Sequence, residues 1–188
     1  MHVLGLMTGT SADCVDAVLA EFTEKPNKPK WKIHNFISVP YPELLQQKVI
    51  EIGQGLKLSS QEWIHIAREI TNIHYQASIS CDPLSKREIV GCHGQTVWHE
   101  PPDKKKEGMS WQMIQSPSLA NSLNCPVVYD FRAADLAVGG QGAPLVPKPD
   151  EALLGRVPGW RVILNLGGIS NLTVIPPNCG PERFEEIR

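Results

Sequence analysis

The chain has 188 residues, of which 41% are hydrophobic and 20% are charged, and its net charge at pH 7 is −2. This composition argues against a disordered chain, and the balance of acidic and basic residues provides no basic surface for nucleic acid. No apolar run approaches the roughly 18 residues that a membrane-spanning helix needs. From the charge balance we expect no nucleic-acid partner, and from the short apolar runs we expect no membrane partner. The length fits one ordinary domain, or one domain and part of a second.

The cysteines are odd in number and contain no CxxC pair. They are Cys14, Cys81, Cys92, Cys125 and Cys179. Because no histidines cluster with them along the chain, the pattern indicates neither a disulfide framework nor a zinc site. The N-terminus lacks the basic region and apolar stretch of a secretory signal. We therefore expect a protein of the reducing cytoplasm.

The first 40 residues predict three antiparallel strands. Residues 3–7 are apolar, residues 8–11 form a turn-like segment with one glycine, and residues 15–22 alternate between apolar and polar side chains. This pattern is typical of a β-hairpin that turns at glycine. A third strand is predicted over residues 31–39, after a polar segment that contains prolines.

Two helices are predicted next. The first covers residues 43–52, where we expect the apolar residues Leu44, Leu45, Val49 and Ile52 to form a buried stripe. The second runs from about Ser60 to Cys81, since a serine at position 59 or 60 can cap it and the glutamate at position 62 can complete a capping box.

The rest of the chain alternates between strands and helices. Strands are predicted at residues 88–92, 111–114, 126–129, 161–166 and 170–175, and helices at 116–123 and near 150–154. The lysine run 104–106 is expected to be a solvated loop. Residues 162–170 weakly repeat the pattern of residues 3–11, so a second domain is expected to begin near Asp130. The alternation indicates an α/β fold.

The turn after the first strand is the first candidate site. Gly9, the two hydroxyl residues after it and the backbone around them can bind a phosphate, and Asp13 and Asp16 can orient a hydrated Mg²⁺. The same residues are also ordinary in a hairpin turn. The segment is not a P-loop, because the GxxxxGK[ST] spacing and its lysine are absent.

Polar side chains follow the strand that ends near Cys92. His93, Gln95, Thr96 and His99 beside a tryptophan suit a sugar at the carboxyl end of a strand, or they form a satisfied surface loop. A metal site is less favoured here, because no third ligand is evident. A rival hypothesis makes Cys14 or Cys92 a nucleophile with His93 or His99 as its base, although a cysteine that ends an apolar strand is usually buried and inert.

Arg132 follows the last of the predicted central strands. Its guanidinium can clamp a carboxylate or phosphate, or it can pair with an aspartate of its own domain. The glycine-dense segment 139–144 indicates a loop, which can be a hinge, a backbone surface for a ligand, or a simple turn.

Five blocks taken together closely resemble the anhydro-N-acetylmuramic acid kinases. They are residues 5–16 (GLMTGTSADCVD), 91–101 (GCHGQTVWHEP), 130–132 (DFR), 139–147 (GGQGAPLVP) and 165–172 (NLGGISNL). The blocks occur in the family's order and cover nearly the whole chain, which corresponds to the N-terminal half of the family's usual length. The resemblance implies the sugar kinase, Hsp70 and actin superfamily. It therefore implies a ribonuclease-H-like (actin-like ATPase) domain with a mixed sheet over residues 1–130, and the incomplete start of a similar domain over residues 131–188.

The resemblance also implies an activity and its site. These bacterial enzymes use ATP and Mg²⁺ to convert 1,6-anhydro-N-acetylmuramic acid to N-acetylmuramic acid 6-phosphate in peptidoglycan recycling. The residues implied to bind the ATP phosphates are Gly9, Thr10, Ser11, Ala12, Asp13, Cys14, Val15 and Asp16, with Asp13 and Asp16 reaching Mg²⁺ through water. The residues implied to line the sugar side are His93, Gln95, Thr96, Arg132, Gln141 and Gly142, of which Arg132 is implied to hold the lactyl carboxylate or a phosphate.

The sequence departs from the family's pattern in three places. Thr8 replaces a serine and keeps a hydroxyl, whereas Cys14 replaces a glycine. If that glycine were needed for a positive φ or for close approach to a phosphate, Cys14 would weaken ATP binding by about 1 to 2 kcal/mol. The third departure is the family block Asp-Thr-Gly-Pro-Gly-Asn, which carries the catalytic base, should follow Ile175 and is absent from these residues.

The missing block leaves two hypotheses. We expect the chain alone to have no kinase turnover, and we expect a homodimer or a separately encoded C-terminal half as a partner. The alternative is an inactive remnant, or a half that binds sugar or nucleotide and needs a separate C-terminal half.

Overall fold

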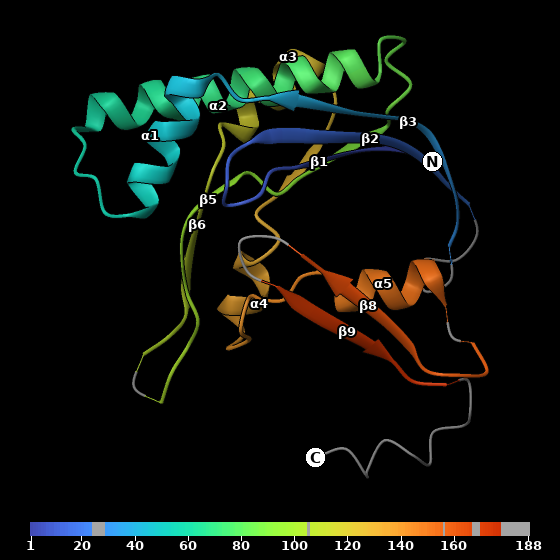
Figure 1. Ribbon diagram of the computed structural model, residues 1–188. Coiled ribbons are helices and arrows are strands. Elements are labelled where there is room, and N and C mark those ends of the chain that lie inside the picture. Colours follow the sequence, from blue (N-terminus) through green and yellow to red (C-terminus); the bar gives the residue numbers. More distant parts are fainter. Residues whose placement is uncertain (24–28, 105, 156, 167–169, 178–188) are drawn as a thin grey trace. The chain divides into compact units, whose positions relative to one another are not determined.

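The computed structural model describes residues 1–23, 29–104, 106–155, 157–166 and 170–177 (Figure 1). These residues divide into two compact units. The first unit contains residues 1–23 and 31–143, and the second contains residues 29–30 and the residues from 144 onward. The domain boundary expected near residue 130 stays a prediction.

A mixed five-stranded sheet forms the centre of the first unit. Its strands are β1 (His2–Met7), β2 (Cys14–Thr23), β3 (Lys30–Pro40), β4 (Ile89–Cys92) and β7 (Val127–Tyr129), in the order β3-β2-β1-β4-β7. β1 and β2 form the predicted antiparallel hairpin, in which His2 lies opposite Glu21 and Met7 opposite Asp16. β4 is parallel to β1 and to β7. The α/β class and the mixed sheet are therefore confirmed.

Three helices accompany this sheet. They are α1 (Glu43–Gly53), α2 (Ser60–Cys81) and α3 (Ser116–Leu123), and α2 packs against β1, β2 and α3 (Figure 1). The predicted capping box begins α2: the backbone N–H of Glu62 donates to Ser59 Oγ at 3.3 Å, and the N–H of Ser59 donates to the Glu62 carboxylate at 2.8 Å. Both bonds satisfy donors that the first helical turn leaves free, so this local signal fixes where the helix begins.

The expected burial of Leu44 is wrong, because its side chain is 82% exposed. Leu45, Val49 and Ile52 are buried at the i, i+4, i+7 spacing of one helix face. Leu44 precedes Leu45 by one residue, which is a rotation of about 100° around the helix, so it leaves that face.

Two features of the first unit were not predicted. β5 (Gln95–Glu100) pairs with β6 (Met109–Met113) as an antiparallel hairpin, and the single turn of helix α4 (Ala133–Ala137) follows β7. β5 contains Gln, Thr, His and Glu, so its composition resembled a polar loop. α4 has only five residues, which is too short for a periodic pattern.

The second unit contains α5 (Pro147–Leu154), β8 (Arg161–Asn165) and β9 (Asn171–Ile175). β8 and β9 pair antiparallel, so the predicted strand pair is confirmed. The glycines expected to turn it, Gly167 and Gly168, lie outside the described residues, as does Cys179. In the part of the chain that the structure describes, no helix is both long and apolar enough to cross a membrane.

A buried histidine on α2 predicts a loss of stability in acid. His74 is fully buried, its Nδ1 lies 2.8 Å from the carbonyl oxygen of Ile70, and its Nε2 has no partner. Burial lowers the pKa of His74 to about 4 from an ordinary value of 6.5. Between these two values the unfolded chain binds the proton and the folded chain does not, so the free energy of unfolding decreases as the pH decreases.

Replacing His74 by leucine should therefore reduce this pH dependence. The pKa difference corresponds to about 3 kcal/mol lost between pH 6.5 and pH 4 in the unmodified chain. Urea unfolding across this range should show a shallower slope for His74→Leu. His65→Leu is the matched control, because His65 is an exposed histidine on the same helix; an unchanged slope in His74→Leu would contradict the assignment.

Candidate functional site

The turn between β1 and β2 is closed by its own backbone. The N–H of Ala12 donates to the carbonyl oxygen of Gly9 at 3.1 Å, and Ala12 has a φ of 48° although it is not glycine. Asp13 Oδ1 accepts from Ser11 Oγ and from the N–H of Cys14, both at 3.0 Å. Thr10 and Ser11 are exposed, and Val15 is buried in the core. Apart from Ala12 and Val15, whose side chains are fully buried, the turn thus presents hydroxyl, backbone and carboxylate groups at the end of the hairpin.

The left-handed backbone of this turn is at Ala12, and Cys14 is not among the residues with a positive φ. Cys14 is the first residue of β2. A backbone penalty from the cysteine at this position is therefore not present. Its Sγ lies 3.5 Å from Asp16 Oδ1, and burial, Asp16 and Asp13 raise the pKa of the Cys14 thiol, so the thiol stays protonated at neutral pH.

If this turn binds the ATP phosphates, as the resemblance implies, replacing Cys14 by glycine should change ATP affinity by no more than about twofold, because the backbone at position 14 already has an ordinary conformation. Titration with ATP and Mg²⁺ measures the affinity, and Cys81→Ala, a buried cysteine outside the turn, is the control. A tenfold change in affinity would mean that the thiol or its bulk contacts the phosphate.

The second carboxylate of the turn region is on β2. Asp16 Oδ1 accepts a hydrogen bond from Ser38 Oγ on β3, in addition to its contact with Cys14. Asp16 also lines a cavity of about 300 Å³ on the sheet, together with Gly5, Phe36, Gly91 and Phe131. Carboxylate oxygens with hydroxyl neighbours are the donors that Mg²⁺ prefers, usually with several waters retained, so this donor set fits the ion.

Gln95, at the start of β5, joins the turn to the sugar-side segment. Its Oε1 accepts from Thr8 Oγ1 at 3.2 Å and from the Tyr41 hydroxyl at 3.3 Å. Its Nε2 donates to the carbonyl oxygens of Gly9 at 3.1 Å and Thr96 at 3.4 Å. Gln95 is fully buried, so these four bonds use its whole amide. The side chain therefore holds the turn and β5 in one arrangement.

Thr96, the next residue, has a different partner. Its Oγ1 donates to Gln112 Oε1 on β6 at 2.7 Å, and Gln112 Nε2 donates to Ser110 Oγ at 2.6 Å. These bonds connect the two strands of the β5–β6 hairpin. The Thr96 hydroxyl is thereby held beside Gln95, but it bonds to β6 and not to the β1–β2 turn.

His93 lies between β4 and β5 and is fully buried, with no hydrogen-bond partner on either ring nitrogen. Its ring stacks on Phe131, with centroids 5.6 Å apart. Burial, with a further contribution from Arg132, lowers the pKa of His93 to about 4. The imidazole is therefore neutral at pH 7 and offers both a donor and an acceptor to a ligand.

Arg132 organises the glycine-rich loop. Its Nη1 donates to the carbonyl oxygen of Gly142 at 2.6 Å, and the N–H of Gly142 donates to Asp135 Oδ2 at 2.7 Å. Gly142 has a φ of 67°, and an added Cβ would lie 2.9 Å from Leu136 and 3.2 Å from His99, so a larger residue would be strained here. Gln141 is exposed. The Nε of Arg132 is buried without a partner, so one donor of the guanidinium is available to a ligand.

The side chains of His93, His99 and Arg132 influence one another electrostatically. Arg132 contributes to the lowered pKa of His93 and, after burial, to that of His99. Burial also lowers the pKa of Arg132, whereas Asp130 opposes that change. The structure thus brings His93, Arg132 and Gly142 together, and it brings Gln95 to the turn.

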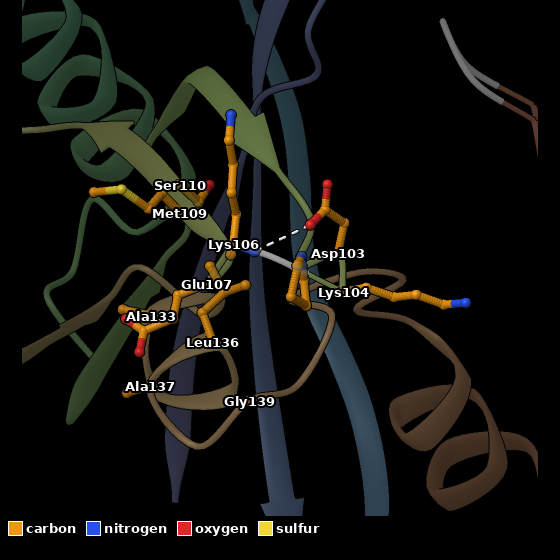
Figure 2. A pocket seen from close by; sticks show the side chains of 12 residues that line it. Asp103, Lys104, Lys106, Glu107, Met109, Ser110, Ala133, Leu136, Ala137 and Gly139 are labelled. Carbon is orange, nitrogen blue, oxygen red and sulfur yellow. Dashed lines mark hydrogen bonds between the residues drawn. The ribbon is translucent and has the colours of Figure 1, made fainter.

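A cavity that sequence reasoning missed lies between the β5–β6 hairpin and α4 (Figure 2). Its volume is about 630 Å³, which is within the range of small-molecule sites. Asp103, Lys104 and Lys106 line one side, Leu136 lies on α4, and the two lysine side chains extend in different directions. The six residues expected to contact the sugar are not among those that line it. No sequence signal marks this cavity, because it forms only when the unpredicted hairpin and α4 meet.

The structure does not support a cysteine nucleophile at position 92. Cys92 is fully buried on β4, and burial raises the pKa of its thiol to about 12. A thiol with this pKa is almost entirely protonated at pH 7 and does not reach a substrate.

The sequence matches known proteins over nearly its whole length. The family model described as "Anhydro-N-acetylmuramic acid kinase" matches residues 1–186. A protein with that name from Prochlorococcus marinus (strain MIT 9313) is 61% identical over 187 residues, which are 100% of this chain and 49% of that protein. Another from Synechococcus sp. (strain CC9902) is 57% identical over 188 residues, which are 100% of this chain and 50% of that protein. The chain spans about half the length of these curated relatives.

Proposed function

Because this chain belongs to the anhydro-N-acetylmuramic acid kinase family, we propose that it is the N-terminal half of an ATP-dependent kinase that acts on 1,6-anhydro-N-acetylmuramic acid. The observation that carries the proposal is the Gln95 amide, which bonds to Thr8 and Gly9 at one end and belongs to the sugar-side strand at the other. A single buried side chain thereby fixes the distance between the two predicted binding segments.

The reaction requires three bond changes at the sugar. Water, activated by a carboxylate base that the family carries outside this chain, attacks the anomeric carbon and the bond from that carbon to O6 breaks. O6 then takes the γ-phosphoryl group of ATP, which leaves N-acetylmuramic acid 6-phosphate and ADP. Because the transferred group needs positioning and charge stabilisation more than covalent chemistry, the contribution of this chain is to bind and orient.

We assign the phosphate end to the β1–β2 turn. Residues 9–16 present backbone N–H groups and the hydroxyls of Thr10 and Ser11, and Asp13 and Asp16 would hold Mg²⁺ through water. When bound, the ion neutralises the charge of the phosphates. The Ser38 and Ser11 hydroxyls, which bond to the two carboxylates, keep those side chains oriented.

We assign the sugar end to the residues around His93 and Arg132. The neutral His93 ring can exchange hydrogen bonds with hydroxyl groups, and the half-buried guanidinium of Arg132 matches the charge of the lactyl carboxylate. Gln95 and Thr96 fix the strand beside them. Gln141 and Gly142 supply the adjacent loop, whose backbone Arg132 already contacts.

The same proposal covers the fold and the setting. We propose that residues 1–130 are an actin-like ATPase domain and that residues 131–188 begin a second domain. We also propose that the enzyme works in the cytoplasm in peptidoglycan recycling. A C-terminal half or a second copy of the chain would complete it. The mixed sheet order with an antiparallel opening hairpin supports the fold.

An assay of ADP release tests the proposal. The chain alone should give no turnover, and the chain mixed with the C-terminal half of the Prochlorococcus marinus relative should release ADP only when the anhydro-sugar is present. Release from the chain alone would contradict the expected inactivity. No release from the mixture, with both halves folded and bound to each other, would favour the alternative of an inactive remnant.

A further inference from the structure

Three titratable side chains from three neighbouring strands meet at one end of the sheet in the first unit. They are His2 on β1, Glu21 on β2 and His34 on β3, and one possible ligand atom from each lies within 4.8 Å of the other two. His2 and Glu21 are directly opposite in the β1–β2 ladder, and β3 is the neighbour of β2. The strand register, and not the sequence spacing, creates this cluster.

The distances within the cluster suit a small coordination sphere. His34 Nε2 lies 3.1 Å from Glu21 Oε2, and the rings of His2 and His34 have centroids 5.3 Å apart. A tetrahedral zinc ion with ligand distances of about 2.0 to 2.2 Å separates its ligand atoms by about 3.3 to 3.6 Å. The wider separations can close by rotation of the side chains, because His34 is exposed and the other two are only half-buried.

The donor set selects the kind of ion. Two imidazoles and one carboxylate are a common protein ligand set for Zn²⁺, whereas Mg²⁺ and Ca²⁺ prefer oxygen alone. We propose that His2, Glu21 and His34 bind one divalent transition metal of the zinc class, in a site that is separate from the nucleotide and sugar residues and that ties the edge strand β3 to β1 and β2.

A fourth residue supports the geometry from outside the cluster. Glu88, which immediately precedes β4, accepts the backbone N–H of His2 at 2.7 Å, and its carboxylate lies 3.6 Å from His2 Nδ1. A carboxylate beside the ring of a ligating histidine orients that ring. Glu88 also lies 3.9 Å from the amino group of Met1, so its charge is shared with a cation and not only with the site.

Metal titration of the purified chain tests the site. Calorimetry with Zn²⁺ should give one equivalent, Co²⁺ should give visible ligand-field bands, and Mg²⁺ should not compete. His34→Gln and Glu21→Gln should each weaken Zn²⁺ binding at least tenfold and remove the Co²⁺ bands. His65→Gln is the matched control, since it removes an exposed histidine from α2, and it should bind as the unmodified chain does.

Two further measurements separate this site from other metal ligands and from misfolding. Zn²⁺ should raise the melting temperature of the unmodified chain but not of His34→Gln. Histidine side-chain NMR on the unmodified chain should show Zn²⁺-dependent shifts for His2 and His34 but not for His65, whether or not the variants fold. The proposal is wrong if no binding occurs below about 100 μM Zn²⁺ or if Cys14→Ser abolishes the binding. It is also wrong if the His2 and His34 resonances do not respond to Zn²⁺. In each case the cluster is only a hydrogen-bonded histidine and glutamate.

Discussion

Replacing Gln95 by leucine is expected to lower the free energy of unfolding by about 4 kcal/mol. The substitution removes four hydrogen bonds. The hydroxyls of Thr8 and Tyr41 then lose the acceptor that Gln95 Oε1 provides, and both residues are buried, with 2% and 5% of their surface exposed. Each buried polar group left unsatisfied costs about 1 to 3 kcal/mol. The carbonyl oxygen of Gly9 also loses its donor, so the β1–β2 turn should become less ordered.

Urea unfolding at pH 7 measures this effect. The matched control is Gln47→Leu, because Gln47 is exposed on α1 and its side chain bonds to Glu51, one turn further along the same helix; its effect should be below about 0.5 kcal/mol. A loss below 1 kcal/mol in Gln95→Leu would contradict the assignment of Gln95 as the side chain that joins the two segments.

Replacing Arg132 by alanine is expected to weaken sugar binding about 100-fold while ATP affinity changes no more than about threefold. A charge-assisted hydrogen bond to a carboxylate contributes about 1.5 to 3 kcal/mol, and 2.7 kcal/mol corresponds to 100-fold at 25 °C. The guanidinium is half-buried beside His93 and His99 and has a buried donor without a partner, so a ligand carboxylate gains a full contact there.

Steady-state kinetics of the two combined halves separates the binding role from a structural one. KM for the sugar should rise and KM for ATP should not, and an anhydro-sugar without the lactyl group should be insensitive to the change. Arg68→Ala, an exposed arginine on α2, is the control. If both KM values rise together, Arg132 acts by holding the Gly142 loop through its 2.6 Å bond and not by binding the sugar.

Local signals explain which elements could be predicted. The capping box at Ser59 and Glu62 and the periodic apolar face of α2 place that helix at residues 60–81, as the structure has it. The first hairpin was also predictable, because its alternation and its glycine lie next to each other in the sequence. β5 was not, since four of its six side chains are polar and its pairing with β6 depends on residues nine or more positions away.

Long-range contacts explain what remained hidden in the site. The motifs indicated that Gln95 matters, but they could not indicate that its amide bonds to Thr8 and Tyr41, because those residues are 87 and 54 positions away in the chain. The cluster of His2, Glu21 and His34 was hidden for the same reason, since only strand pairing brings the three side chains together. The sequence left open whether Cys14, in place of the family's glycine, would strain the backbone. The structure answers this question, because the positive φ is at Ala12.

Binding of 1,6-anhydro-N-acetylmuramic acid to the folded chain tests the central claim most directly. All of the proposed sugar contacts lie within residues 93–142 of one compact unit. Calorimetric titration should therefore show one saturable site, and Trp98, which is 57% exposed on β5, should change its fluorescence in parallel. Arg132→Ala should weaken the binding reported by both signals about 100-fold; a folded chain that binds no sugar, or that binds it equally well without Arg132, would contradict the proposed sugar site.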